Sequence, residues 1–206
     1  TGTVWGGTYS QKFSIHGEKA TLSNVEIKPA TYDGTEKTPE ISFTLTDAAG
    51  KVITGVKPVI VPQGTDTYID ANSYSIKVAV EGKYEVVPVD AVFVISAADL
   101  TKLNVTPVYP EGSDAYLLNA ENKTDGITPA FQVVLGGKTV TLTNKDITGV
   151  AAIKKTGAST QSLTGIGNYS GDVTVEVNTL ADINDLYVPA IEDETYNGEA
   201  QTPEFK

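Results

Sequence analysis

The sequence predicts an all-β protein built of tandem β-sandwich modules arranged head to tail along the chain. Three observations predict it. Apolar and polar residues alternate in many short segments, which indicates strands with one buried face. Turn residues separate these segments every ten or so positions, as is typical of a sandwich. Two tyrosine motifs recur about every eighty residues, which indicates an internal repeat.

The alternation defines the strands. It is clearest at three places: Ile41, Phe43 and Leu45; Tyr74, Ile76, Val78 and Val80; Phe131, Val133 and Leu135, followed by Val140 and Leu142. The segments Asp47-Ala48-Ala49-Gly50 and Gly136-Gly137 supply the residues with positive φ that hairpin turns require. The one helical candidate is the segment from Asp114 to Lys123, which contains Tyr116, Leu117 and Leu118.

The first repeated motif opens a module and reads Tyr-x-Gly, three residues, Thr-Pro. Its two full copies are Tyr32, Gly34, Thr38 and Pro39, and Tyr196, Gly198, Thr202 and Pro203. We expect a middle copy at Tyr109-Pro110-Glu111-Gly112, with Thr128 and Pro129 as its Thr-Pro pair. An insertion from Ser113 to Ile127 stretches this copy.

The second motif closes a module and reads Gly-x-Tyr. Its copies are Gly7 and Tyr9, Gly82 and Tyr84, and Gly167 and Tyr169, each leading into an alternating strand. The two motifs together predict four segments. Residues 1–17 are the closing strands of a preceding repeat, 18–98 a whole repeat, 99–183 a second repeat with the insertion 113–127, and 184–206 the opening strand of a following repeat.

With Tyr-x-Gly-x-x-x-Thr-Pro opening a unit and Gly-Asn-Tyr-Ser-Gly closing one, the chain resembles the YGX-type (MBG-like) Ig-like repeats of bacterial surface proteins. The resemblance implies tandem Ig-like β-sandwich modules in a head-to-tail array. It also implies a cell-wall or secreted location in a bacterium, most often Gram-positive, and a role in adhesion or spacing with neighbouring repeats as partners. It brings no catalytic residues.

Composition excludes several classes of function. The net charge of −11 argues against binding to nucleic acid, because phosphate recognition needs clustered Lys and Arg. No apolar run approaches the ~18 residues of a membrane span, so we expect no membrane insertion. The absence of cysteine removes thiol catalysis and thiolate metal sites. The chain begins without a leader sequence, so we expect any signal peptide or anchor to lie outside it.

The residues do not predict an enzyme. The one histidine, His16, is the single candidate base for a serine-type triad, and its setting is that of a linker. The acidic residues are scattered among turns and solvent faces, without the paired carboxylates of a glycosidase.

Two special chemistries stay open. Asp66 and Asp70 flank Tyr68 in a loop, so a calcium ion is an alternative to a turn-forming role for these residues. An intramolecular Lys–Asn isopeptide bond needs a buried lysine beside an Asn and an acid, and Lys12, Lys28, Lys77 and Lys138 lie on or near predicted strands.

The leading hypothesis is a non-catalytic spacer module of an adhesin-like protein. A first alternative places a host or cell-wall glycan or protein at the insertion, with Tyr116, Asn119 and Asn122 as ligand-binding residues, because extra loop residues on a rigid scaffold often bind. A second alternative is a filament subunit. In it, Thr202 to Lys206 of one chain add to the sheet that contains residues 4–15 of the next.

Overall fold

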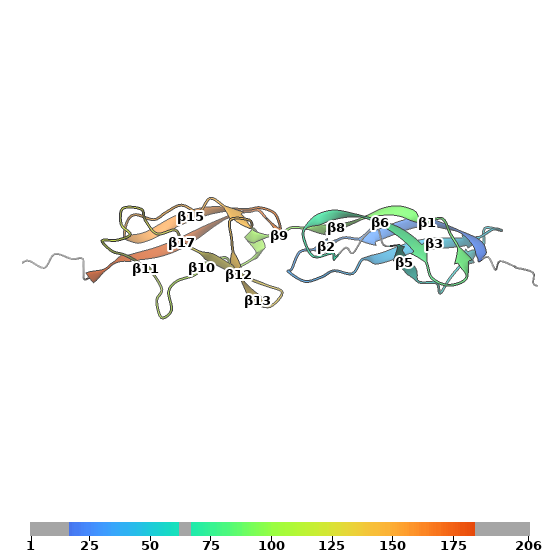
Figure 1. Cartoon of the computed structure of the whole chain (residues 1–206), viewed down its shortest axis with the longest axis horizontal. Helices are drawn as coiled ribbons and strands as arrows, with labels where there is room; N and C mark the ends of the chain where they lie inside the picture. Colours follow the sequence, from blue (N-terminus) through green and yellow to red (C-terminus); the bar gives the residue numbers. More distant parts are fainter. Residues whose placement is uncertain (1–16, 62–66, 184–206) are drawn as a thin grey trace, which may run out of the picture. The chain divides into compact units, whose positions relative to one another are not determined.

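The computed structural model describes residues 17–61 and 67–183, and these form strands in two compact units (Figure 1). The chain divides between Ala97 and Ala98, so unit 1 here means residues 17–97 and unit 2 means residues 98–183. No α-helix lies in the described part of the chain, which confirms the all-β prediction. Accordingly, none of the described residues forms a helix long and apolar enough to cross a membrane.

Unit 1 contains two four-stranded sheets. The first has the order β4-β3-β1-β7, with β1 (Glu18–Lys28), β3 (Glu40–Asp47), β4 (Val52–Ile53) and β7 (Tyr84–Glu85). The second has the order β2-β8-β6-β5, with β2 (Ala30–Thr31), β5 (Pro58–Val61), β6 (Asn72–Val80) and β8 (Val89–Ser96). Most pairs are antiparallel, but β7 lies parallel to β1 and β2 lies parallel to β8.

The core of unit 1 lies between these two sheets. Leu22 and Leu45 come from the first sheet, and the second sheet contributes Ile76, Val78, Phe93 and Ile95. The buried side chains fall at alternate positions along β6 and β8, as the period of two requires. The predicted alternation at Ile76 and Val78 therefore marks the buried face correctly.

Unit 2 is built from three sets of paired strands. One has the order β10-β12-β13, with β10 (Thr106–Pro107), β12 (Phe131–Leu135) and β13 (Lys138–Leu142). Another has the order β11-β17-β15-β14, with β11 (Tyr116–Leu118), β14 (Ile147–Thr148), β15 (Gly157–Gly165) and β17 (Asp172–Ala181). The third pairs β9 (Ala98–Asp99) with β16 (Tyr169–Ser170), and the short 3-10 helix η1 (Leu100–Lys102) follows β9.

Unit 2 has buried residues of its own. Phe131, Val133, Leu163, Val177 and Leu100 are all at most 1% exposed. Their positions alternate along β12 and β17, so each of these strands has one buried and one wet face. Each unit thus buries its own set of side chains.

The two units share one order of strands. The sheet β2-β8-β6-β5 of unit 1 corresponds strand by strand to β11-β17-β15-β14 of unit 2, including the parallel pair at β2–β8 and β11–β17. The sheet β4-β3-β1-β7 corresponds to β13-β12-β10 together with β9-β16. In unit 2 the strand that corresponds to β1 is divided by η1 into β9 and β10, so it belongs to two separate sets of paired strands.

Both predicted hairpin turns are confirmed. The Asp47 carboxylate accepts hydrogen bonds from the N–H groups of Ala49 and Lys51, both at 2.9 Å, and closes the turn between β3 and β4. Gly136 and Gly137, with φ of 57° and 79°, join β12 to β13 as the two central residues of a tight hairpin.

The helix predicted from Asp114 to Lys123 is wrong. Residues Tyr116–Leu118 form β11, which pairs in parallel with β17, and turns follow it up to Asp125. Leu118 and Ala115 are buried. The long-range pairing with β17 therefore decides the local conformation of this segment.

The strand order also corrects the predicted middle copy of the opening motif. Tyr32 directly follows β2, whereas Tyr109 precedes β11, the strand that corresponds to β2. Residues 113–127 are not simply an added loop, because they include β11. The segment that follows β11, as Tyr32 follows β2, begins at Asn119.

Candidate functional site

The Gly-x-Tyr motif occupies the same place in both units. In unit 2, Tyr169 lies opposite Ala98 in the parallel pair β16–β9, and the Ala98 N–H donates to the carbonyl oxygen of Asn168 at 2.9 Å. In unit 1, Tyr84 lies opposite Glu18 in the parallel pair β7–β1. There the N–H of Glu18 donates to the carbonyl oxygen of Lys83 at 2.8 Å. In each unit the motif therefore binds the closing segment to the first strand.

The two tyrosines differ in burial. Tyr169 is 2% exposed, and Tyr84 is half-buried against the core of unit 1. The glycines of the motif, Gly82 and Gly167, both have positive φ, 99° and 62°. These four predicted motif residues thus lie in turns and strand pairs and form part of the scaffold.

Asp99 fixes the start of η1 next to this strand pair. Its carboxylate accepts hydrogen bonds from the N–H of Thr101 at 3.0 Å and from the Thr101 hydroxyl at 2.6 Å. These bonds, with a smaller contribution from Lys102, lower the pKa of Asp99. A side chain at Gly171 would meet this carboxylate, because a Cβ there would lie 2.8 Å from Asp99 Oδ1.

The opening motif of unit 1 forms a turn held by Asp33. The Asp33 carboxylate accepts from the N–H of Thr35 at 2.9 Å and pairs with the ammonium group of Lys37. These contacts, that with Lys37 first and those with Thr35 next, lower the pKa of Asp33 to about 2. Gly34, at φ 78°, completes the turn. Tyr32 packs against the core of unit 1.

The Thr-Pro pairs precede β3 and β12, the strands that correspond in the two units. Thr38 and Thr128 are exposed, Pro39 is half-buried and Pro129 is buried. The second full copy of the motif, Tyr196, Gly198, Thr202 and Pro203, lies outside the described residues.

The three predicted ligand-binding residues make hydrogen bonds within the chain. The Tyr116 hydroxyl donates to the carbonyl oxygen of Val108 at 2.6 Å and accepts from the N–H of Ala130 at 3.1 Å, and burial raises its pKa. The Tyr116 ring meets the Tyr109 ring edge to face, with centroids 5.2 Å apart. Tyr116 therefore joins the segments that precede β11 and β12.

Asn119 and Asn122 close the turn after β11 reciprocally. The Asn119 N–H donates to Asn122 Oδ1 at 2.9 Å, and the Asn122 N–H donates to Asn119 Oδ1 at 3.0 Å. The Asn122 side-chain amide also donates to the carbonyl oxygen of Leu117 at 3.0 Å. Both side chains thus stabilise the turn. A pair of asparagines three residues apart is typical of a turn, so the sequence already contained this signal.

The structure offers no support for the metal site within its described part. No group of three or more metal-binding side chains occurs in residues 17–61 and 67–183. Asp70 is exposed and its backbone oxygen accepts a hydrogen bond from Tyr74, while Asp66 lies outside the described residues. Calcium binding by Asp66 and Asp70 therefore stays a prediction.

The lysines proposed for an isopeptide bond are not buried where the structure describes them. Lys28 and Lys77 form surface ion pairs with Glu40 and Asp90, and their side chains are 70% and 43% exposed. Lys138 is exposed as well. These three lysines lack the burial that the bond requires. Lys12 and the candidate base His16 both fall outside the described residues.

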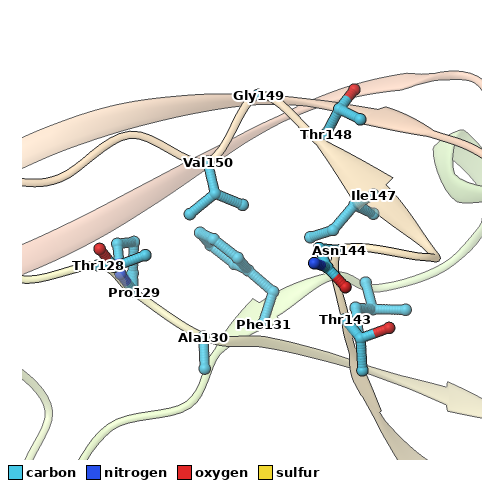
Figure 2. Close-up of a pocket in the computed structure, with 11 residues that line it drawn as sticks. Thr128, Pro129, Ala130, Phe131, Thr143, Asn144, Ile147, Thr148, Gly149 and Val150 are labelled. Atoms are coloured by element: carbon cyan, nitrogen blue, oxygen red, sulfur yellow. The ribbon is translucent and has the colours of Figure 1, made fainter.

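Sequence reasoning missed a hollow in unit 2 of about 450 Å³. It is formed by the segment before β12, the end of β13 and the segment around β14. Its lining residues are Thr128, Pro129, Ala130, Phe131, Leu142, Thr143, Asn144, Ile147, Thr148, Gly149 and Val150. Figure 2 shows the Phe131 ring pointing toward Val150, with Pro129 beside it.

The hollow has an apolar floor and an uncharged polar rim. Phe131, Ile147 and Leu142 are buried, and the exposed Thr143 and Asn144 contribute a hydroxyl and an amide. None of the lining residues titrates near neutral pH. The Thr143 hydroxyl already donates to the Asp146 carboxylate at 2.7 Å and accepts from the N–H of Lys145 at 3.2 Å. The lining therefore supplies mainly apolar contact, and no general base or activated nucleophile lies among these residues.

Comparison of the chain with models of protein families, with curated proteins and with solved structures gives no match.

Proposed function

We propose that the chain is a structural spacer of a bacterial cell-surface or secreted protein, made of successive Ig-like sandwich modules of the YGX-like type. Its task is mechanical, since modules in series hold an adhesive region away from its anchor. The observation that carries the proposal is the common strand order of the two units, with the Gly-x-Tyr motif at the same strand pair in each. A chain that repeats one self-contained unit is typical of such arrays.

The internal use of the conspicuous polar side chains supports this proposal. Asp33, Asp99, Asn119 and Asn122 accept hydrogen bonds from backbone N–H groups of their own turns. These hydrogen bonds stabilise the connections between strands. Those of Asn119 and Asn122 favour a scaffold role for residues 113–127 over the alternative in which that segment binds a glycan or protein ligand.

Stretching single molecules tests the mechanical role. Two units with separate cores predict two unfolding events, each releasing roughly 80 residues, or about 280 Å of extended chain. One event that releases the whole chain at once would contradict the proposal. A chain that extends without resistance would contradict it as well.

The location needs a separate test. An antibody raised against the purified chain, applied to intact cells of the source organism, is expected to label their surface or to detect the protein in the medium. Labelling that requires permeabilised cells would overturn the surface assignment. The mechanical result would stand in that case, so the two parts of the proposal fail independently.

A further inference from the structure

The first and last segments of unit 1 run side by side in the same direction. The first segment consists of β1 and β2, and the last segment consists of β7 and β8. The start of β1 pairs in parallel with β7, where Glu18 lies opposite Tyr84. At the other end β2 pairs in parallel with the end of β8, where Thr31 lies opposite Ser96. The two segments are therefore paired at both of their ends.

Hydrogen bonds bracket these two parallel pairs. The N–H of Glu18 donates to the carbonyl oxygen of Lys83 at 2.8 Å, and the N–H of Tyr32 donates to the carbonyl oxygen of Ser96, also at 2.8 Å. The Lys83 ammonium group adds an ion pair with the Glu18 carboxylate at 2.7 Å. Each end of the two segments is thus connected by direct bonds.

Unit 2 has the same arrangement. Its first segment runs from β9 to β11 and its last segment consists of β16 and β17, with β9 parallel to β16 and β11 parallel to β17 (Figure 1). The N–H of Ala98 donates to the carbonyl oxygen of Asn168 at one end. At the other end the N–H of Asp182 donates to the carbonyl oxygen of Leu118 at 2.9 Å.

We propose that the parallel pairs between the first and last segments form a clamp in each unit, which resists force applied along the chain. A pull through the chain draws the first segment toward its N-terminal end and the last segment toward its C-terminal end. Because the segments are parallel, these two directions are opposite and lie along the strands. The bonds that cross between the strands must then break together, whereas a pull that separates the strands sideways opens them in turn.

The clamp rests on the proposed function, since resistance to force matters only in a chain that carries tension. It adds to that function the strand pairs that resist the tension and the direction in which they do so.

Unit 2 contains a side-chain connection between the same two segments. The N–H of Asn178 in β17 donates at 2.9 Å to the hydroxyl of Tyr109, which lies between β10 and β11. The hydroxyl of the neighbouring Tyr116 instead bonds to Val108 and Ala130, neither of which belongs to the last segment. The two hydroxyls therefore form a matched pair, because only that of Tyr109 joins the first segment to the last.

Pulling unit 1 in two directions within the whole chain tests the clamp. Introduced cysteines serve as attachment points, since the chain contains no other cysteine. Glu18→Cys, Ser96→Cys places these points at opposite ends of the paired segments, whereas Glu18→Cys, Glu81→Cys places both at one end, because Glu81 shortly precedes Tyr84. All three replaced residues are exposed, and both variants lose the ion pair with Lys83 alike.

The unfolding force at one fixed pulling speed is the readout. We expect it to be at least roughly twofold higher for Glu18→Cys, Ser96→Cys than for Glu18→Cys, Glu81→Cys, because only the first geometry makes the bonds between the segments break together. An equal or lower force would overturn the clamp. The chain pulled from its two ends would still unfold in two steps in that case, so a failure of the clamp is distinguishable from a failure of the proposed function.

Tyr109→Phe and Tyr116→Phe test the side-chain connection in unit 2, pulled between Ala97→Cys and Ile183→Cys. Each variant removes one hydroxyl and keeps the ring. We expect Tyr109→Phe to lower the unfolding force more than Tyr116→Phe does, although Tyr116→Phe removes two hydrogen bonds. An equal or larger loss of force in Tyr116→Phe would show that resistance follows overall stability, and would overturn the clamp in unit 2.

Discussion

Tyr169 lies opposite Ala98 in a parallel strand pair and is only 2% exposed. The corresponding tyrosine of unit 1, Tyr84, lies opposite Glu18 but is only half-buried. The Gly-x-Tyr motif thus forms corresponding strand pairs in both units, but its tyrosine side chain buries more of its surface in unit 2 than in unit 1.

Removing the two tyrosines is expected to destabilise the units unequally. Tyr169→Ala empties a closed site and lowers the stability of unit 2 by about 3–5 kcal/mol, a typical value for deleting a buried aromatic ring. Tyr84→Ala costs unit 1 less, because part of that ring already contacts water. Denaturant unfolding followed by probes within each unit measures both losses. Equal losses would contradict the difference in packing.

Gly149 and Gly137 form a matched pair for testing a close backbone approach. Both have positive φ, 90° and 79°, so alanine introduces similar backbone strain at each. At Gly149 an added Cβ would lie 2.2 Å from the carbonyl oxygen of Ser162, whereas at Gly137 it meets nothing within 4 Å. We expect Gly137→Ala to cost about 1 kcal/mol and Gly149→Ala about 3 kcal/mol or more. Thermal unfolding of both variants measures the difference, and equal values would refute the contact.

The Asp33–Lys37 pair predicts a small dependence of stability on acid. The pKa of Asp33 is lowered to about 2 in the folded chain, so the pair stabilises unit 1 above the ordinary carboxyl pKa near 4. This contribution is lost as the pH falls from about 4 to about 2. Because the pair is partly exposed and screened, we expect it to stay below about 1 kcal/mol.

The variant Asp33→Asn isolates that contribution. The stability difference between Asp33→Asn and the unchanged chain is expected to shrink as the pH falls through this window, and to shrink with added salt at neutral pH. Urea unfolding at a series of pH values measures it. A difference that is constant from pH 5 to pH 2 would show that the carboxylate charge plays no part.

Thr179 offers a stabilising substitution. Thr179 is 1% exposed, and its hydroxyl has no hydrogen-bond partner among the residues that the structure describes. Valine has nearly the same shape without the polar group, so Thr179→Val is expected to stabilise unit 2 by about 1 kcal/mol. Thr174→Val, at an exposed position of the same strand, should change stability by less than about 0.5 kcal/mol. A loss of stability in Thr179→Val would mean that the hydroxyl makes a stabilising contact.

Much of the fold follows from local sequence. Alternation placed Leu45, Ile76, Val78, Phe131 and Val133 on buried faces, and turn chemistry placed both hairpins. Tyr116–Leu118 could not be assigned in this way, since three residues are too few to separate a period of two from a helical period. Their conformation depends on pairing with β17, more than fifty residues later.

The candidate site was predictable only where it repeats. The Gly-x-Tyr segments were found because the motif recurs in the sequence, and its two copies in the described part of the chain form corresponding strand pairs. The middle copy of the opening motif was misplaced at Tyr109, because a short sequence match does not show whether it lies before or after a strand. The hollow beside Phe131 was missed, since segments distant in sequence meet only in the folded unit.

Hydrogen exchange of the variant Phe131→Ala tests most directly whether each unit closes its own core. Phe131 is fully buried in unit 2, so its loss should open that unit. The account predicts faster exchange throughout residues 98–183, while residues 17–97 exchange as they do in the unchanged chain. Faster exchange in both units to the same extent would contradict the central claim, because it would show one cooperative core.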